Sequence, residues 1–219
     1  MEWSWHPVSL SFFVAAAATL VAFILAVPAA YLMANGRWRG RAVLETFFFL
    51  PLVLPPTVIG FLLILLFGNN SPVGRIWEWL TGNSMMFTVS AAILAAASVA
   101  FPLMYQSIKT GFQSVDPNIL GAARVDGASN WKLLIFILIP LSMRALAAGA
   151  VLSYTRAFGE FGATLMFAGN IPGHTQTIPT AIYLAIETGQ DKLAWYYVLI
   201  SIFFSFILLY AISMAGRKS

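Results

Sequence analysis

The sequence predicts an all-α polytopic membrane protein with about five transmembrane helices. Of its 219 residues, 60% are hydrophobic and 9% are charged, whereas a soluble domain carries about 25% charged residues. The mean hydropathy is +0.83, and the apolar residues gather in runs of the roughly 20 residues that a helix needs to cross a membrane. In such a composition the net charge of +4 must be assigned loop by loop, and it does not indicate a nucleic-acid partner.

The N-terminal sequence and the absence of cysteine further limit the class of protein. The sequence contains no cysteine, so it predicts neither a disulfide framework nor a thiolate metal site, and we expect no metal. The N-terminus carries Glu2 and no basic segment, and the apolar run that follows is too long for a signal peptide. We therefore expect a retained first span, and a single transmembrane domain over residues 1–219.

Five apolar runs define the expected spans. Trp3 and Trp5 precede the first run, and Trp195 opens the last, which suits the enrichment of aromatic side chains at the membrane interface. The expected spans cover approximately residues 9–33, 43–67, 86–108, 134–158 and 195–214.

The basic residues predict the orientation of these spans. The loops after the first, third and fifth runs hold the following eight Lys and Arg residues: Arg37, Arg39, Arg41, Lys109, Arg124, Lys132, Arg217 and Lys218. The opposite loops hold only Arg75 and Lys192, while Arg144 and Arg156 fall within the fourth run. The richer side is cytoplasmic by the positive-inside rule, so we expect the N-terminus outside and the C-terminus in the cytoplasm.

The loop between the second and third runs has a pattern of its own. Its residues GNNSPVGRIWEWLTGNS predict a turn, a short amphipathic helix and a second turn. We expect Trp77 and Trp79 at the outer membrane interface, in a structural role.

The second run is interrupted by prolines in LPLVLPPTVIGF, at Pro51, Pro55 and Pro56, with Gly60 following. These prolines leave backbone carbonyls unpaired at membrane depth, which is tolerated only where protein buries them or water reaches them. One interpretation is a plain kinked helix. The other, which the remaining signals favour, is a broken helix that lines a pathway and offers Thr57 as a hydroxyl.

The fourth run ends with Arg156 and Glu160, four residues apart and therefore on one helix face. Ionisable residues inside a span mark an interior or a pathway. The two side chains either form a structural ion pair that braces a dimer interface or gate, or contact an anionic substrate directly. We favour the ion pair, because Glu160 would repel an anion. Gly159 and Gly162 flank the pair and permit close helix approach.

Two apolar stretches after this pair, residues 161–169 and 178–187, are too short to span the membrane. Proline and glycine lie between them, so we expect a re-entrant or external segment. His174 in this segment is expected to be a surface residue and not a ligand.

Residues 116–140, DPNILGAARVDGASNWKLLIFILIP, are the longest charged stretch between apolar runs. Asp116 followed by Pro117 predicts a helix N-cap with proline in the first turn. Ala122 and Ala123 lie on a face of small side chains, which could dock closely against another protein. An ordinary cytoplasmic loop is the alternative interpretation of this helix pattern.

The rest of this stretch predicts a second helix. Gly127 interrupts the first helix, and Ser129 or Asn130 can cap the next one. Pro140 predicts a break or kink within the apolar run that follows.

Ala122-Ala123, Gly127, Ile137 and Pro140 together resemble the EAA loop of binding-protein-dependent ABC importer permeases. That loop has Glu-Ala-Ala, three residues, Gly, nine residues, Ile, one residue and Leu-Pro. Gly121 stands here in place of Glu, and Ile139 in place of Leu. The glycine removes any contact that the carboxylate makes, and it weakens the helix by roughly 1 kcal/mol relative to alanine.

Three motifs in order, LPLVLPPTVIG, this EAA-like loop and FGEFGATLMFAGNIPGHTQTIP, resemble the permease subunit of molybdate importers within the sulfate/molybdate group. The similarity runs from about Arg37 to Glu187, and the segment NIPG-x-T-x-TIP discriminates most. It implies a type I ABC importer permease fold with a cytoplasmic coupling helix, in the inner membrane of a prokaryote. Sulfate, thiosulfate and tungstate permeases remain open as alternatives.

The resemblance also implies partners. No lysine completes a Walker A pattern, so we expect no enzyme activity and no cofactor in this chain, with ATP-Mg bound by two partner ATPase subunits. A homodimer, an external molybdate-binding protein and membrane lipid complete the expected assembly. The residues expected to dock the ATPase are Ala122, Ala123, Arg124, Asp126 and Gly127.

The imported dianion would cost tens of kcal/mol to move unpaired into hydrocarbon, so it requires a hydrated path. The residues expected to line or gate this path are Pro55, Pro56, Thr57, Gly60, Ser153, Thr155, Arg156, Gly159, Glu160 and Thr164. An ion-coupled secondary transporter is the rival function, but such proteins usually show inverted repeats and acidic coupling residues. A membrane scaffold is a further rival, for which the EAA-like loop has no purpose.

Overall fold

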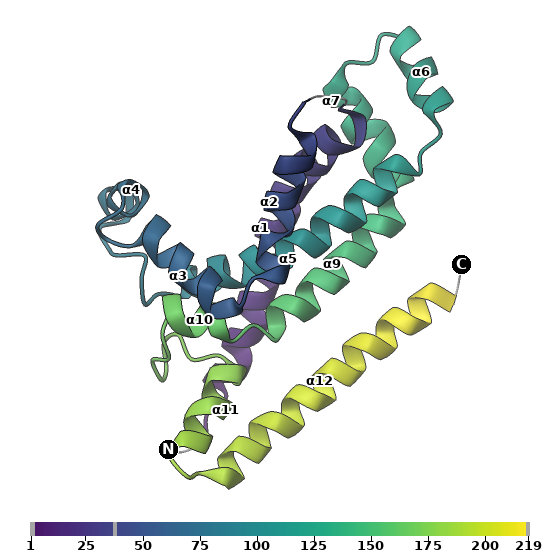
Figure 1. The fold of residues 1–219 in the computed structure, drawn as a ribbon. Coiled ribbons are helices and arrows are strands. Elements are labelled where there is room, and N and C mark those ends of the chain that lie inside the picture. The colour runs from purple at the N-terminus through teal and green to yellow at the C-terminus, as the bar shows by residue number, and fades with distance from the viewer. Residues whose placement is uncertain (1–2, 37–38, 218–219) are drawn as a thin grey trace.

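The computed structural model describes residues 3–36 and 39–217, and these are helical with connecting turns (Figure 1). The helices are α1 (His6–Asn35), α2 (Arg41–Val53), α3 (Pro56–Phe67), α4 (Pro72–Thr81), α5 (Val89–Gln113), α6 (Pro117–Val125), α7 (Asn130–Leu133), the π-helical turn η1 (Leu134–Leu138), α8 (Ile139–Leu141), α9 (Met143–Phe158), α10 (Gly162–Phe167), α11 (Ile178–Glu187) and α12 (Asp191–Arg217).

Three described helices, α1, α5 and α12, are long and apolar enough to cross a membrane by themselves. Two further pairs of helices are apolar and long enough only when taken together, and each pair is bent at a short break. The pair α2–α3 bends by 117°, and the segment from α7 to α9 bends by 77° between Leu141 and Met143. The described residues thus hold three candidate spans, or five if each bent pair is one span, and five is the number predicted. The second bend follows Pro140 as expected, and the wide turn η1 before it gives room to the proline ring, which clashes with a carbonyl in a regular helix.

The core is the packing of α1 and α9 against α5. Alanines at helical spacing on α1, including Ala18, Ala22 and Ala26, are fully buried. Facing helices use glycine in the same way: a Cβ on Gly111 of α5 would lie 2.5 Å from Cβ of Ala145 on α9. Small residues allow this close approach, which stabilises helix contacts in a membrane through van der Waals packing.

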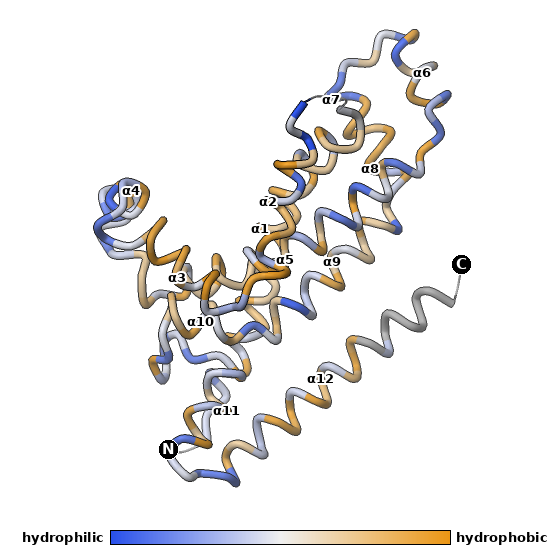
Figure 2. The backbone as a smooth tube through the Cα atoms, in the orientation of Figure 1, coloured by the Kyte–Doolittle hydropathy of each residue, from blue (hydrophilic) through white to orange (hydrophobic). Residues whose placement is uncertain are grey.

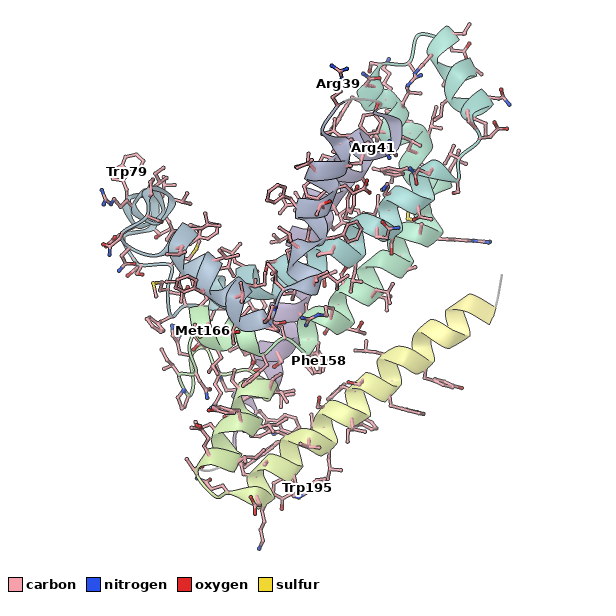
Figure 3. The ribbon with its side chains drawn as sticks, viewed as in Figure 1. Arg39, Arg41, Trp79, Phe158, Met166 and Trp195 are labelled. Atoms are coloured by element: carbon pink, nitrogen blue, oxygen red, sulfur yellow. The ribbon has the colours of Figure 1, made fainter. Side chains whose placement is uncertain are left out.

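The two ends of the bundle differ in character. Helices α6 and α7 lie at the end where α1 finishes and α2 begins, whereas the N-terminus, α11 and the start of α12 lie at the other end (Figure 1). Apolar residues cover most of the helices, and hydrophilic residues concentrate towards the tips (Figure 2). Arg39 and Arg41 lie at the end that carries α6 (Figure 3), so the basic loop between α1 and α2 is on the same side as α6. Arg37 and Lys218 lie outside the described residues.

Several connecting segments match their predictions. The amphipathic loop helix is α4, and Trp79 in its last turn is 83% exposed. The two short apolar stretches are α10 and α11, and His174 between them is exposed. One assignment was wrong: Lys109 is not a loop residue, because α5 continues to Gln113 and carries Lys109 in its last turns.

Candidate functional site

The break between α2 and α3 lies at Leu54 and Pro55. Both residues have extended backbone, with ψ angles of 144° and 138°. A proline excludes the helical conformation from the residue before it, so Pro55 acts on Leu54 and Pro56 acts on Pro55. The prediction of a broken helix is confirmed. Pro51 is tolerated inside α2, and Thr57 is exposed beyond the break.

Helix α3 packs closely on α10 through two glycines. A Cβ on Gly60 would lie 2.5 Å from Cβ of Met166, and a Cβ on Gly162 would lie 2.8 Å from Cβ of Pro56. Met166 lies where α3 and α10 meet (Figure 3). The structure therefore brings together two motifs, residues 55–60 and 159–164, that are about a hundred positions apart in sequence.

Arg156 and Glu160 form the predicted ion pair at the junction of α9 and α10. The guanidinium Nη1 lies 2.8 Å from Oε2 of Glu160, and the two side chains are 31% and 2% exposed. The other carboxylate oxygen, Oε1, accepts a hydrogen bond of 2.9 Å from the backbone N–H of Ala163 in the first turn of α10. Glu160 thus connects the end of α9 to the helix that packs on α3, and its negative charge is compensated. Gly159 beside the pair is exposed.

The hydroxyl groups expected to line a path do not all reach a surface of the chain. Ser153 is fully buried, and it donates a hydrogen bond of 3.1 Å to the carbonyl of Ala100 on α5. Thr164 is 1% exposed. Each of these two side chains is enclosed by packing within the chain. Thr155 is half-buried and donates to the carbonyl of Leu152 on its own helix at 2.9 Å.

Helix α6 projects from the bundle (Figure 1). Asp116 caps it as predicted, accepting a hydrogen bond of 2.8 Å from the N–H of Asn118. The structure describes all nine residues of α6, and none of them is buried. Ile119 and Val125 are 45% and 88% exposed. A projecting helix that exposes large apolar side chains is suited to contact with a partner.

Gly127 follows the C-terminal end of α6 and has a conformational role there. This residue has φ of +82°, and the next N–H, of Ala128, donates back to the carbonyl of Ala123 at 2.9 Å, which closes the helix end. Apart from Gly127 itself and the two residues beside it, no described residue has an atom within 4 Å of a Cβ built on Gly127. Within the chain, the requirement for glycine is therefore its positive φ and not close packing. Ser129 caps α7, accepting from the N–H of Lys132 at 3.4 Å.

The NIPG-x-T-x-TIP segment forms a compact turn before α11. Thr177 and Thr180 exchange hydrogen bonds as a capping box, and the N–H of Ile178 donates to Oγ of Ser11 on α1 at 2.7 Å. The side-chain amide of Asn170 donates to the carbonyl of Thr180 at 3.0 Å. These hydrogen bonds explain in structural terms why the motif contains polar residues.

A second ion pair was missed at the level of sequence. Glu45 on α2 pairs with Lys109 on α5, and the Tyr105 hydroxyl donates to the same carboxylate oxygen at 3.0 Å. Glu45 is an ionisable residue near the start of an apolar run, a pattern that indicates a partner inside the protein.

Two known proteins are similar in sequence to this chain over most of its length. YvgM of Bacillus subtilis, which is named as a molybdenum transport system permease protein, is 55% identical over 206 residues, covering 94% of this chain and 91% of YvgM. The molybdenum transport system permease protein ModB of Escherichia coli is 40% identical over 185 residues, covering 84% of this chain and 80% of ModB.

A solved structure shares the fold. A chain of a bacterial alginate ABC transporter, solved in complex with an alginate pentasaccharide-bound periplasmic protein, superposes with a TM-score of 0.72 at 18% identity and covers 97% of this chain and 78% of its own. The family model described as binding-protein-dependent transport system inner membrane component matches residues 26–217. The chain belongs to this family of ABC transporter permeases.

Proposed function

We propose that this chain is the membrane-spanning permease subunit of an ATP-driven importer for the oxyanion molybdate, with residues 1–219 acting as one transmembrane domain in a homodimer. The observation that carries the proposal is its identity of 55% and 40%, over most of its length, to two proteins named as molybdenum transport permeases. The broken spans and the projecting helix α6 are the parts that such a function needs.

Energy for transport comes from two partner ATPase subunits that bind ATP-Mg, since this sequence has no Walker A pattern. Helix α6 docks into these subunits through the small-residue face of Ala122 and Ala123, with Arg124 and Asp126 as polar contacts. All four side chains are at least partly exposed. Closure of the ATPases on ATP then pulls the two permease halves apart at the outer face.

The proposed orientation follows from the basic loops. Helices α6 and α7 lie at the same end as Arg39 and Arg41 (Figure 3), and basic loops face the cytoplasm. In the inner membrane of a prokaryote this puts the N-terminus, α11 and the turn before it outside. An external molybdate-binding protein meets the permease on that outer end.

The pathway runs past the α2–α3 break and the end of α9. Thr57 and Thr155 offer hydroxyl groups there, while Arg156 is already paired with Glu160. A strong unpaired cation would hold a dianion too tightly for release, whereas a compensated site lets it pass. Selectivity for the oxyanion therefore resides mainly in the external protein.

The direct test is uptake into proteoliposomes that contain this chain with its cognate ATPase and binding protein. We expect molybdate uptake that requires ATP and the binding protein, with tungstate competing strongly and sulfate weakly. Uptake without ATP, driven by an ion gradient, would contradict the proposal. Stronger competition by sulfate than by molybdate would reassign the substrate.

A further inference from the structure

Glu45, Lys109 and Tyr105 form a polar cluster between α2 and α5. Lys109 and Tyr105 both donate to Oε1 of Glu45, and Nζ of Lys109 lies 5.8 Å from the centre of the Tyr105 ring. The side chains of Lys109 and Glu45 are only 13% and 22% exposed. A pair shielded to this extent is less screened by water and salt than a surface ion pair.

This cluster matters because the other contacts of α2 with the core come from partly buried side chains such as Phe48 and Phe49. The structure describes all 13 residues of α2, and none of them is buried. Besides the cluster, aromatic rings connect the two helices: Phe48 and Phe49 lie 5.1 Å and 5.8 Å from the Tyr105 ring, centre to centre. Aromatic pairs are tolerated over centroid distances of about 4.5–7 Å, whereas hydrogen bonds need their two atoms about 2.7–3.2 Å apart, so the ion pair with its shared hydroxyl donor limits the register of the two helices more narrowly.

The cluster also lies between α6, which is proposed to dock the ATPase, and the break between α2 and α3. On one side, α5 runs from Lys109 to its end at Gln113 and leads directly to the cap of α6 at Asp116. Phe112 and Val115 in this connection are buried in the core, so the end of α5 moves with the bundle. On the other side, α2 leads to the break at Leu54 and to α3, which packs on α10.

We propose that Glu45, Lys109 and Tyr105 are positioning residues that make α2 follow α5 when α6 is displaced, an inference that rests on the proposed function. Movement of the ATPases reaches α5 through α6, and the cluster passes it to α2 and thus to the broken helix. Without the cluster, ATP is hydrolysed while the broken helix moves less than α5 does.

The test uses the complete reconstituted importer. Glu45→Gln and Lys109→Met are expected to lower the molybdate transported per ATP hydrolysed by about tenfold, a usual size for coupling between sites, while the ATPase still co-purifies. The exchange E45K/K109E should restore most of the ratio, since it rebuilds the pair. Glu78→Gln, which changes an exposed carboxylate on α4, is the matched control and should transport as the original protein does.

A distance measurement separates positioning from mere stability. Because the sequence has no cysteine, spin labels can be placed at two exposed sites, Val43→Cys on α2 and Gln106→Cys on α5. We expect their distance to stay constant through the ATP cycle in the original protein and to vary in Glu45→Gln. Should Glu45→Gln fail to assemble, Tyr105→Phe, which keeps the ring and loses the hydroxyl, carries the same test with a smaller loss.

Two results would overturn the inference: a normal transport ratio in the variants that break the cluster, or no recovery in the fully assembled exchange variant. An original complex that transports no molybdate would instead overturn the proposed function, so the two failures are distinct.

Discussion

Helix α6 and the contact between α3 and α10 are built in opposite ways. The ends of α6 are determined within a few residues, by the cap at Asp116 and the positive φ of Gly127. The contact between α3 and α10 depends on Gly60 meeting Met166 across a distant part of the chain. Helix α6 has exposed side chains, whereas the carboxylate of Glu160 is buried beside the contact between α3 and α10.

Substitutions in the two regions should therefore change different measured quantities. Substitutions on the surface of α6 should leave the free energy of unfolding almost unchanged and alter assembly with a partner. Substitutions between α3, α9 and α10 should lower the free energy of unfolding first, whatever their effect on transport.

The largest expected effect on stability is that of Arg156→Met. It leaves Glu160, whose side chain is 2% exposed, without its counter-charge, and breaking a buried pair in this way costs about 3–5 kcal/mol. The loss should appear as a lower unfolding temperature of the purified permease in detergent.

Glu160→Gln is the matched partner of that variant. Its amide oxygen can still accept from the N–H of Ala163, and the 31% exposed side chain of Arg156 can reach water, so the cost should be about 1–2 kcal/mol. If Arg156→Met and Glu160→Gln lowered the free energy of unfolding equally, the ion pair would not be the reason why Glu160 is buried.

Gly60→Ala should have the next largest effect. The added Cβ would meet Cβ of Met166 at 2.5 Å and the backbone of Ala163 at 3.2 Å, and overpacking of this kind costs about 1–3 kcal/mol. Gly159→Ala is the control, because the nearest atom to its Cβ is the carbonyl oxygen of Thr155 at 3.8 Å. Thermal unfolding of both variants checks this, and an unchanged Gly60→Ala protein would argue against close packing of α3 on α10.

A smaller effect is expected at the end of α6. Gly127→Ala places a side chain at φ of +82° and should cost about 1 kcal/mol locally, whereas Gly127→Asn should cost less because asparagine tolerates this conformation. If backbone conformation is the requirement, co-purification with the ATPase should be nearly normal for Gly127→Asn. Complete loss of the ATPase with asparagine would instead show that this position needs space for the partner.

The two regions also differ in how far the sequence alone could predict them. Asp116, Ser129, Pro55 and Pro140 act on the backbone beside them, so caps and breaks could be predicted without a fold. The ion pair of Arg156 and Glu160 was also predictable, because helical spacing brings the two side chains together.

Contacts between distant helices could not be predicted in this way. A hydroxyl such as that of Ser153 can line a path or bond to a neighbouring helix, and only the packing on α5 shows which carbonyl it meets. Lys109 looked like a loop residue because it follows the end of an apolar run. The helix continues past the end of that run, to Gln113. The pairing of Lys109 with Glu45 depends on how α2 lies against α5.

Cross-linking from single cysteines tests most directly whether α6 is the surface that meets the ATPase. The sequence contains no cysteine, so Val125→Cys on α6 and Trp79→Cys on α4 each introduce one at a site that is 88% or 83% exposed. In the assembled importer, a short bifunctional reagent should join Val125→Cys to the ATPase subunit and leave Trp79→Cys unlinked to it. Linkage from Trp79→Cys and none from Val125→Cys would contradict both the orientation of the chain and the role of α6.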